Sequence, residues 1–198
     1  MGVKERHERD REVVRRAILD AARDLFVAEG YGNVSIRKVA ERVEYSPAAL
    51  YGYFPSKDDI FFALADEGFR LLQSLSEVEA GANRASRPPL ERVRAQVWRL
   101  YQFSGQHPQY FALMFVDRTV PRISREYEGF GWVREAKARL MADLEACIAT
   151  GAFPANLSPA VAFRLLTIGL LGVATMRLSD RLGPGEDADA LAAGMLDT

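Results

Sequence analysis

The segment VSIRKVAERVEYSPAALYGYFPSKDD, residues 34–59, decides how this chain is interpreted. Its first half predicts a short helix, because Ser35 is a typical N-cap residue and apolar side chains recur at helical spacing from Ile36 onward. Ser46 and Pro47 then start a second helix: serine accepts a hydrogen bond from an unpaired amide, and proline needs no N–H at the first helical position. Two short helices joined by a tight turn are typical of the helix-turn-helix, whose second helix enters the DNA major groove.

The second helix of this segment, residues 47–54, offers few groups that could read DNA bases. Leu50 and Phe54 are its inward-facing apolar anchors. Ala48 and Ala49 are expected to point outward, where they permit close approach and methyl contact with thymine but donate no hydrogen bond. Direct base contacts must therefore come from other residues, and recognition of DNA shape should contribute substantially.

Several polar side chains around the turn are candidates for DNA contact. We expect Arg37 to contact guanine, the alternative being a solvated or phosphate-bound arginine. Tyr45 could meet a base or a sugar. Lys57 lies at a helix N-terminus, which favours a phosphate. Ser35 and Ser46 could donate hydroxyls or amides to phosphates besides capping their helices.

The sequences LYGYF at residues 50–54 and SKDDI at residues 56–60 resemble the signature of the TetR family of one-component transcriptional regulators. The resemblance covers roughly residues 16–64. It includes these further positions: Ala21, Leu25, Phe26, Gly30, Tyr31, Ser35, Ile36, Val39 and Ala40. It implies that the hydroxyls of Tyr51 and Tyr53 contact phosphates; the alternative is that one of the two is a core residue.

The chain departs from the family pattern inside the turn. Glu44 and Tyr45 stand where a glycine and a small aliphatic residue are frequent. A glutamate is strained at positive φ, so we expect a turn of a different shape here.

Helical periodicity continues through the rest of the chain, with no strand pattern and no internal repeat. Beyond the helix-turn-helix, the pattern predicts helices at residues 9–29, 57–79, 90–106, 108–116, 122–150, 160–182 and 188–196. The resemblance implies the same number of helices, three in a head and six in a body. We therefore expect an all-α fold of about nine helices, with a helix-turn-helix DNA-binding domain at residues 1–56 and a ligand-binding and dimerisation domain at residues 57–198.

The charge distribution is compatible with this organisation. The net charge is −1, which excludes a strongly basic nucleic-acid binder. Residues 1–57 contain 11 Lys and Arg against 9 Asp and Glu, whereas residues 58–198 contain 15 against 18. The N-terminal basic residues could form an arm that reaches the minor groove. Because acidic residues are interleaved with them, the alternative is a solvated helix extension with internal ion pairs.

The sequence shows no arrangement typical of an enzyme or a metal site, so we expect no enzyme, no metal and no cofactor. His7 and His107 have no ligands at coordinating spacing, and no nucleophile has a neighbouring base. The single cysteine, Cys147, is expected to be a buried small hydrophobe rather than a redox switch.

The body is rich in aromatic residues. Most of them should be core, but bulky aromatics on several helices can also line a ligand cavity. The resemblance implies such a cavity between the helix at residues 57–79 and the helices that start near residues 90, 108 and 122. The expected lining residues are Trp98, Tyr101, Phe111, Phe115 and Trp132. A small apolar or aromatic effector fits this composition.

The helix at residues 160–182 is apolar nearly all round, so more than one of its faces must be covered. Small residues along one side permit close approach of a second helix. This suits a two-fold, four-helix homodimer interface, which the resemblance also implies; the alternative is an internal core helix. The expected interface residues are Leu165, Ile168, Gly169, Gly172, Thr175 and Met176.

No secretory signal is visible, and the apolar tract at residues 160–176 is interrupted by Arg164 and shorter than a membrane span needs. We expect a cytoplasmic homodimer that represses transcription from a pseudo-palindromic, double-stranded operator and is released by a small, largely apolar ligand. Two other classes remain open: an all-helical enzyme, and a ligand-binding or protein-interaction module whose head no longer binds DNA.

Overall fold

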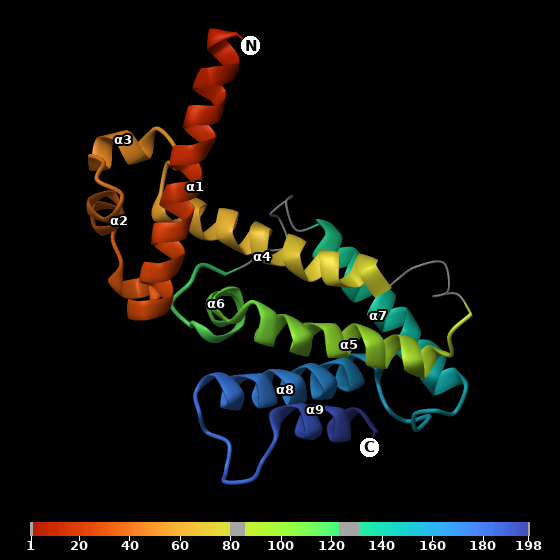
Figure 1. Cartoon of the computed structure of the whole chain (residues 1–198). Helices are drawn as coiled ribbons and strands as arrows, with labels where there is room; N and C mark the ends of the chain where they lie inside the picture. Colours follow the sequence, from red (N-terminus) through yellow and green to blue (C-terminus); the bar gives the residue numbers. More distant parts are fainter. Residues whose placement is uncertain (1, 80–85, 123–130, 198) are drawn as a thin grey trace. The chain divides into compact units, whose positions relative to one another are not determined.

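The computed structural model describes residues 2–79, 86–122 and 131–197 (Figure 1). Within these ranges all regular structure is helical, so the expected all-α class is confirmed. The N-terminal part contains four helical elements: α1 (Val3–Glu29), the 3₁₀ turn η1 (Tyr31–Asn33), α2 (Ile36–Arg42) and α3 (Pro47–Tyr51).

A long helix leads from this part into the remainder of the chain. The elements that follow are α4 (Lys57–Glu79), α5 (Pro89–Gln106), α6 (Pro108–Phe111), the π-helical η2 (Ala112–Val116), α7 (Gly131–Ala149), α8 (Pro159–Leu178) and α9 (Ala188–Asp197). The described ranges thus contain nine α-helices, the number expected.

Several predicted boundaries are wrong. Helix α1 starts six residues earlier than predicted, at Val3, in a stretch where charged residues alternate and can pair along the helix. Helix α8 ends at Leu178 because Asp180 takes a left-handed φ of 52° and the Arg181 N–H closes the end on the carbonyl of Met176 at 2.9 Å. Arg122 is not helical; residues 123–130 lie outside the described residues, and α7 is described from Gly131.

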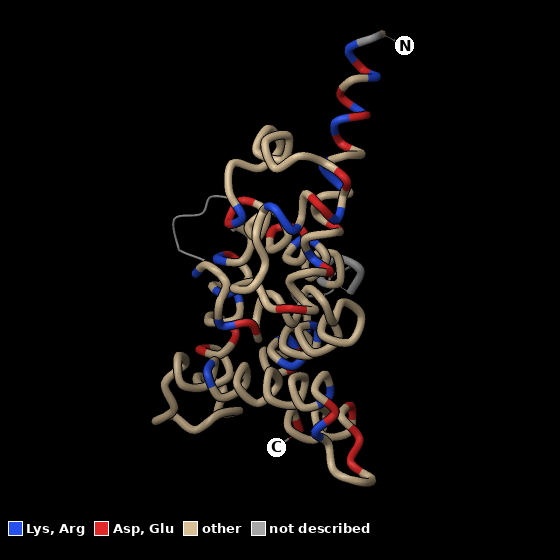
Figure 2. The backbone as a smooth tube through the Cα atoms, turned by 90° about the vertical axis from the view of Figure 1, so that its left-hand side faces the viewer, with Lys and Arg blue, Asp and Glu red and all other residues tan. Residues whose placement is uncertain are grey.

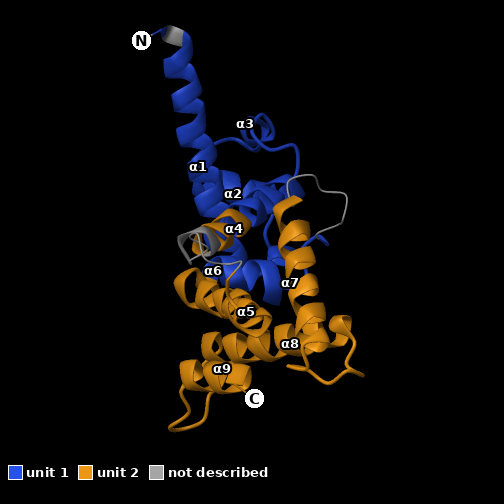
Figure 3. Ribbon diagram, turned by 90° about the vertical axis from the view of Figure 1, so that its right-hand side faces the viewer, with its two compact units in different colours: residues 1–68, 109–124 blue, residues 69–108, 125–198 orange. Residues whose placement is uncertain are grey.

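The chain divides into two compact units, coloured separately in Figure 3. The first contains residues 1–68 and 109–124, and the second residues 69–108 and 125–198. Helix α4 therefore contributes to both units. The first unit combines the predicted DNA-binding domain with the start of α4 and with most of the α6–η2 segment.

Each unit has its own hydrophobic core. In the first, α1 packs against α2 and η1, and α2 packs against α3. Its fully buried side chains include Ile18, Phe26, Val39, Leu50 and Phe61. In the second, α5 packs against α7, α8 and α9, around buried residues that include Val97, Phe103, Leu144, Leu170 and Ala192.

Candidate nucleic-acid interface

The turn between α2 and α3 has the geometry that a glycine would give, although Glu44 occupies it. Glu44 has a φ of 60°. The Glu44 N–H donates to the carbonyl of Glu41 at 3.3 Å, and the Tyr45 N–H donates to that of Ala40 at 3.0 Å, which together form a Schellman helix end. The expectation of a differently shaped turn is therefore wrong. Left-handed backbone costs a non-glycine residue about 1–2 kcal/mol, and burial of Ala40 and Leu50 on either side of the turn offsets this cost.

Both predicted N-caps are formed. The Ser35 hydroxyl accepts a hydrogen bond from the Lys38 N–H at 3.2 Å, and the Ser46 hydroxyl accepts one from the Ala49 N–H at 3.2 Å. Each cap satisfies an amide at the start of a short helix. The two helices are therefore defined at the N-terminal ends that the sequence indicated.

Helix α3 turns its apolar anchors inward and leaves a compact face exposed. Leu50 and Phe54 are 0% and 4% exposed. Tyr45 and Tyr51 are exposed large side chains, and Pro47 and Ala48 are exposed as well. Two residues are less accessible than expected, since Ala49 and Tyr53 are half-buried. The exposed face therefore centres on residues 45–48 and 51.

Arg37 lies on the exposed side of α2 with 80% of its side chain accessible. Its Nε donates to Glu41 one helical turn later at 3.2 Å. An exposed pair of this kind contributes at most about 1 kcal/mol. The guanidinium is thus available to a partner that offers a better acceptor.

Lys57 is engaged within the protein. Its Nζ donates to the carbonyls of Tyr31 and Val34 at 2.8 and 2.9 Å and lies 3.9 Å from the centre of the Tyr31 ring. These contacts use two of its three N–H groups. Lys57 thus holds the segment between α1 and α2, a role that sequence reasoning missed.

Tyr31 is the centre of a polar cluster around that segment. Its hydroxyl bonds to Asp58, and its N–H donates to Asp117 at 2.8 Å. Burial, with Asp58 nearby, raises the pKa of the Tyr31 hydroxyl. Partial burial of Asp117 opposes its ionisation, but hydrogen bonds from Tyr31 and Thr119 outweigh that effect and lower the pKa of the carboxyl. Sequence reasoning missed Asp58, Asp117 and Thr119 as supports of the DNA-binding segment.

Three further contacts support this region: one joins the segment after η2 to the η1 turn, and Arg16 of α1 makes the other two. The Gly32 N–H donates to Thr119 Oγ1 at 2.9 Å. Arg16 pairs with Asp20 at 2.6 Å and with Glu67 of α4 at 2.7 Å. Hydrogen bonds to these carboxylates, Asp20 first, raise the pKa of Arg16 against partial burial. Contacts from α4 and from residues 117–119 therefore support the helix-turn-helix. A local sequence pattern does not reveal these contacts, because their partners are distant along the chain.

The second unit exposes an apolar stripe on α8. Val161, Leu165, Ile168 and Met176 are 48%, 61%, 62% and 40% exposed, and Gly172 has open space beside it. We call these five residues the α8 stripe. They recur every three or four positions, so they share one side of the helix.

Two predicted interface residues do not belong to the α8 stripe. A Cβ on Gly169 would lie 2.1 Å from the sulfur of Met195, so this glycine allows α9 of the same chain to approach. Thr175 is half-buried and donates to the carbonyl of Leu171 at 2.7 Å. Gly169 and Thr175 thus serve packing and hydrogen bonding within the chain.

The predicted ligand-lining residues fall in both units. Phe111 and Phe115 belong to the first, with ring centres 5.3 Å apart. Trp98, Tyr101 and Trp132 belong to the second. The Tyr101 hydroxyl is fully engaged, because it donates to Asp189 at 2.5 Å and accepts from Arg177 at 2.9 Å. Burial first, and the Asp189 bond second, raise the pKa of Tyr101 to about 12.

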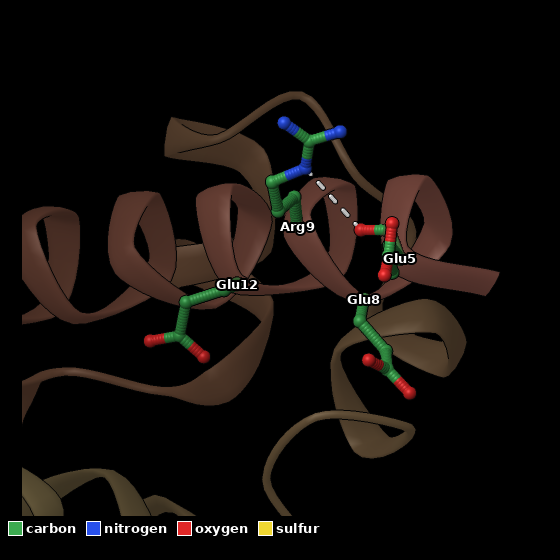
Figure 4. A pocket seen from close by; sticks show the side chains of 4 residues that line it. All are labelled: Glu5, Glu8, Arg9 and Glu12. Atoms are coloured by element: carbon green, nitrogen blue, oxygen red, sulfur yellow. Dashed lines mark hydrogen bonds between the residues drawn. The ribbon is translucent and has the colours of Figure 1, made fainter. Parts of the chain in front are cut away.

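A shallow surface depression lies along α1 and is lined by Glu5, Glu8, Arg9 and Glu12 (Figure 4). All four side chains come from one exposed helix, so the depression is an open surface feature. Among the described residues, no group of three or more His, Cys, Asp or Glu side chains could hold a metal ion. Cys147 is buried, and this burial raises the pKa of its thiol.

Helix α8 spans 20 residues and is apolar enough, by length and composition alone, to cross a membrane. The expectation that this tract is too short for a span is therefore wrong. A core or interface helix of a globular protein can have the same length and composition, so these properties do not assign α8 to a bilayer.

Comparison with known proteins identifies relatives of both parts of the chain. Residues 18–64 match the family model of bacterial regulatory proteins of the tetR family, and residues 93–198 match the tetracyclin repressor-like C-terminal domain. The chain is 36% identical over 91 residues to the HTH-type transcriptional repressor KstR of Rhodococcus jostii strain RHA1. It is 35% identical over 65 residues to the HTH-type transcriptional repressor Rv1474c of Mycobacterium tuberculosis. These matches cover 44% and 33% of this chain and 41% and 35% of the two relatives, so the chain spans less than half of their length.

Solved structures share the fold over most of the chain. Mycobacterium smegmatis AmtR is 28% identical with a TM-score of 0.59, over 92% of this chain and 84% of that one. FadR from Bacillus subtilis in complex with stearoyl-CoA is 16% identical with a TM-score of 0.66, over 92% and 95%. The C-terminal model alone covers more than half of the sequence, and the N-terminal model covers the helix-turn-helix. This chain belongs to the TetR family of regulatory proteins, a family of regulators and not of enzymes.

Proposed function

We propose that this chain is a cytoplasmic transcriptional repressor that binds a pseudo-palindromic operator as a homodimer and is released by a small, largely apolar ligand. The observation that carries the proposal is the exposed face of α3, presented by a complete Schellman turn and anchored by buried Leu50 and Phe54. A helix fixed in this way, with small residues outward, can enter the major groove closely.

The proposed DNA contacts follow the accessibility of each side chain. Arg37 would read guanine, because its exposed guanidinium exchanges a weak ion pair for bidentate acceptors. Tyr51 would donate its hydroxyl to a phosphate, and Tyr45 would meet a base or a sugar. Ser35, Ser46 and Ala48 are exposed as well and would approach the DNA backbone or a base closely.

Other predicted contacts take a smaller part in the proposal. Lys57 has one N–H left beyond its two carbonyl partners, so its main role would be to hold the turn, with a phosphate as a third partner. Tyr53 and Ala49 are half-buried and would contribute through close approach. Recognition of DNA shape would supply much of the specificity, because so few donors lie on the exposed face of α3.

Dimerisation would use the α8 stripe. Its large apolar side chains are exposed in a single chain, and a second copy related by a two-fold axis would cover them with the same stripe. Two heads would then read two half-sites about 34–36 Å apart, or at a slightly larger groove-matched spacing.

Release would follow if the ligand favours a conformation in which the heads are badly spaced. Helix α4 contributes to both units and has 23 residues, about 35 Å at 1.5 Å per residue. It would therefore transmit a ligand-induced change in the body to the DNA-binding head. Trp98, Tyr101 and Trp132 of the second unit are the proposed contacts for an apolar or aromatic ligand. In support, FadR of the same fold was solved with stearoyl-CoA, which carries a long apolar chain.

Selection of binding sites from random DNA with the purified chain tests the function. We expect enrichment of an inverted repeat, and a complex that contains two chains or a multiple of two. Arg37→Ala should change the selected sequence, whereas Tyr51→Phe should weaken binding to every sequence by a similar factor. Failure to enrich any sequence, with a monomeric particle in solution, would contradict the proposal and favour a module that does not bind DNA.

A further inference from the structure

Helix α3 is held at its start by a side-chain cap, at its middle by a buried anchor and at its end by a contact from another helix. It has five residues, and a helix this short is unstable without tertiary contacts. The Ser46 cap holds its first turn, and Leu50 anchors its middle in the core. At the end, the Gly52 N–H donates to the carbonyl of Ala49 at 3.1 Å, and the Tyr53 and Phe54 N–H groups donate to that of Leu50 at 2.9 Å each.

A further contact at this end comes from α1. Arg11 Nη2 donates to the carbonyl of Gly52, the C-cap residue of α3, at 2.8 Å. The Arg11 guanidinium carbon lies 5.3 Å from the centre of the Tyr53 ring, and that of Arg15, one helical turn later, lies 5.1 Å from the Phe54 ring. A cation that bonds the last carbonyls of a helix also interacts favourably with the helix dipole.

We propose that Arg11 is a positioning residue, which fixes the C-terminal end of the recognition helix and so sets the angle at which α3 meets DNA. This inference rests on the DNA-binding function proposed above. The N-terminal turns of α1 before Arg11 are exposed and carry alternating basic and acidic residues (Figure 2). Arg11, which follows these turns, contacts the C-cap residue of α3.

The competing role for an exposed arginine in a DNA-binding head is a direct phosphate contact. The two roles differ in their dependence on salt. A phosphate contact weakens binding to all DNA and lowers the salt slope by about one when it is removed. A positioning contact lowers the affinity for the operator, because readout by shape and close approach needs a well-placed helix. It leaves non-specific binding and the salt slope unchanged.

Arg9 provides a matched control. It lies two residues away on the same exposed part of α1, and its Nε donates to the carbonyl of Glu5 within its own helix at 3.3 Å. Arg9→Ala therefore removes the same charge from the same region without touching α3. Arg11→Lys provides the rescue, because a lysine keeps the charge and can donate to the Gly52 carbonyl.

The first measurement needs no DNA. Amide hydrogen exchange of residues 46–54 in the free protein should be faster in Arg11→Ala than in the wild type, whereas Arg9→Ala and Arg11→Lys should exchange at nearly the wild-type rate. The thermal midpoint should stay close to that of the wild type, since Arg11 is exposed. Unchanged exchange in Arg11→Ala would overturn the proposal, whatever the outcome for DNA.

The second measurement compares operator and random duplex DNA over a range of salt concentrations. Arg11→Ala should bind the operator about tenfold more weakly, the order expected for a lost hydrogen bond from a charged group. Its binding to random DNA and its salt slope should stay the same, and Arg11→Lys should recover most of the affinity. Equal loss on both DNAs with a smaller slope would overturn the proposal in favour of a phosphate contact. A wild type that selects no operator would instead refute the repressor function, while the exchange result would still judge the Arg11 contact.

Discussion

Helices α3 and α8 both leave side chains exposed, but the two exposed surfaces differ in kind. Helix α3 presents a small face of alanine, proline and tyrosine, and its burial depends on two anchors, Leu50 and Phe54. Helix α8 presents a long row of large aliphatic side chains. A small face with hydroxyls at its edges suits a polar partner with a groove, whereas an exposed aliphatic row suits an apolar partner.

The comparison also shows two ways to hold a helix. Helix α3 depends on contacts at its ends: the Ser46 cap, the turn at Glu44 and the Arg11 bond at Gly52. Helix α8 is long enough to be held along its length by α5, α7 and α9, and its own Ser158 makes no side-chain cap bond. Short elements are therefore expected to be sensitive to single polar contacts, and long elements to changes of apolar surface.

The largest effect is expected from a charge in the α8 stripe. Ile168→Glu should weaken dimerisation about a thousandfold or more, because symmetry places two unpaired charges in one apolar interface. Sedimentation velocity over a concentration series measures this change, and operator affinity should fall with it. Val13→Glu is the control, since Val13 is 68% exposed on α1 of the other unit. If Ile168→Glu dimerises like Val13→Glu, the α8 stripe is not the dimer surface.

The next effect compares the two cores. Leu50→Ala and Leu170→Ala remove the same atoms from side chains that are 0% and 1% exposed, and each should cost about 2–5 kcal/mol of stability. Leu50→Ala should abolish DNA binding while the protein remains dimeric. Leu170→Ala should instead weaken dimerisation, because it lies within α8. Denaturant unfolding measures the stability of both variants, and sedimentation measures their dimerisation. If both variants lost DNA binding and dimerisation to the same extent, the two functions would not be assigned to separate units.

A smaller effect is expected at Asp117, which accepts a hydrogen bond from the Tyr31 N–H at the start of η1. Asp117→Asn should lower stability by about 1.5–3 kcal/mol at pH 7, the range for hydrogen bonds to a charged acceptor. Because the folded pKa of Asp117 is lowered, its contribution is present above the unfolded pKa, about 3.9, and is lost as the pH falls through the folded value. The stability difference between wild type and Asp117→Asn should therefore shrink between pH 5 and more acidic solution. Urea titrations across this range measure it, with exposed Asp10→Asn as the control; a constant difference would contradict the role of the charge.

The smallest effect compares two serines that each precede a proline at a helix start. The Ser46 hydroxyl caps α3, whereas Ser158 at α8 makes no cap bond with its side chain. Ser46→Ala should cost about 1 kcal/mol, and Ser158→Ala close to nothing. Thermal unfolding of the wild type and of both variants measures this difference in stability. An equal loss at both positions would contradict the view that α3 depends on its end contacts more than α8 does.

Much of the head was predictable because its signals are local. The caps at Ser35 and Ser46 and the buried anchors Leu50 and Phe54 follow from neighbouring residues. The turn at Glu44 was not predicted, since a local rule counts the cost of left-handed backbone and misses the packing on both sides that offsets it. Lys57 was placed at a helix start correctly, but its carbonyl partners depend on where the chain between α1 and α2 passes.

Less of the body was predictable, because its signals are compositional. The apolar character of α8 predicted a helix that must be covered, and Leu165, Ile168, Gly172 and Met176 are exposed in the single chain. Gly169 lies against Met195 of α9, since small residues permit close approach without showing which helix approaches. Aromatic content likewise predicted lining residues, but it could not show that the Tyr101 hydroxyl is bonded to Asp189 and Arg177.

By itself, the sequence determined the helical class and the two helices of the helix-turn-helix, because periodicity and caps act between neighbours along the chain, and its resemblance to a family signature indicated the family. Tertiary structure decided which long-range contacts support those elements: Arg11 on Gly52, Asp117 on Tyr31, and Met195 against Gly169. Such pairs join residues from about 26 to 86 positions apart. Their formation depends on how whole helices pack, and no local pattern of residues specifies that packing.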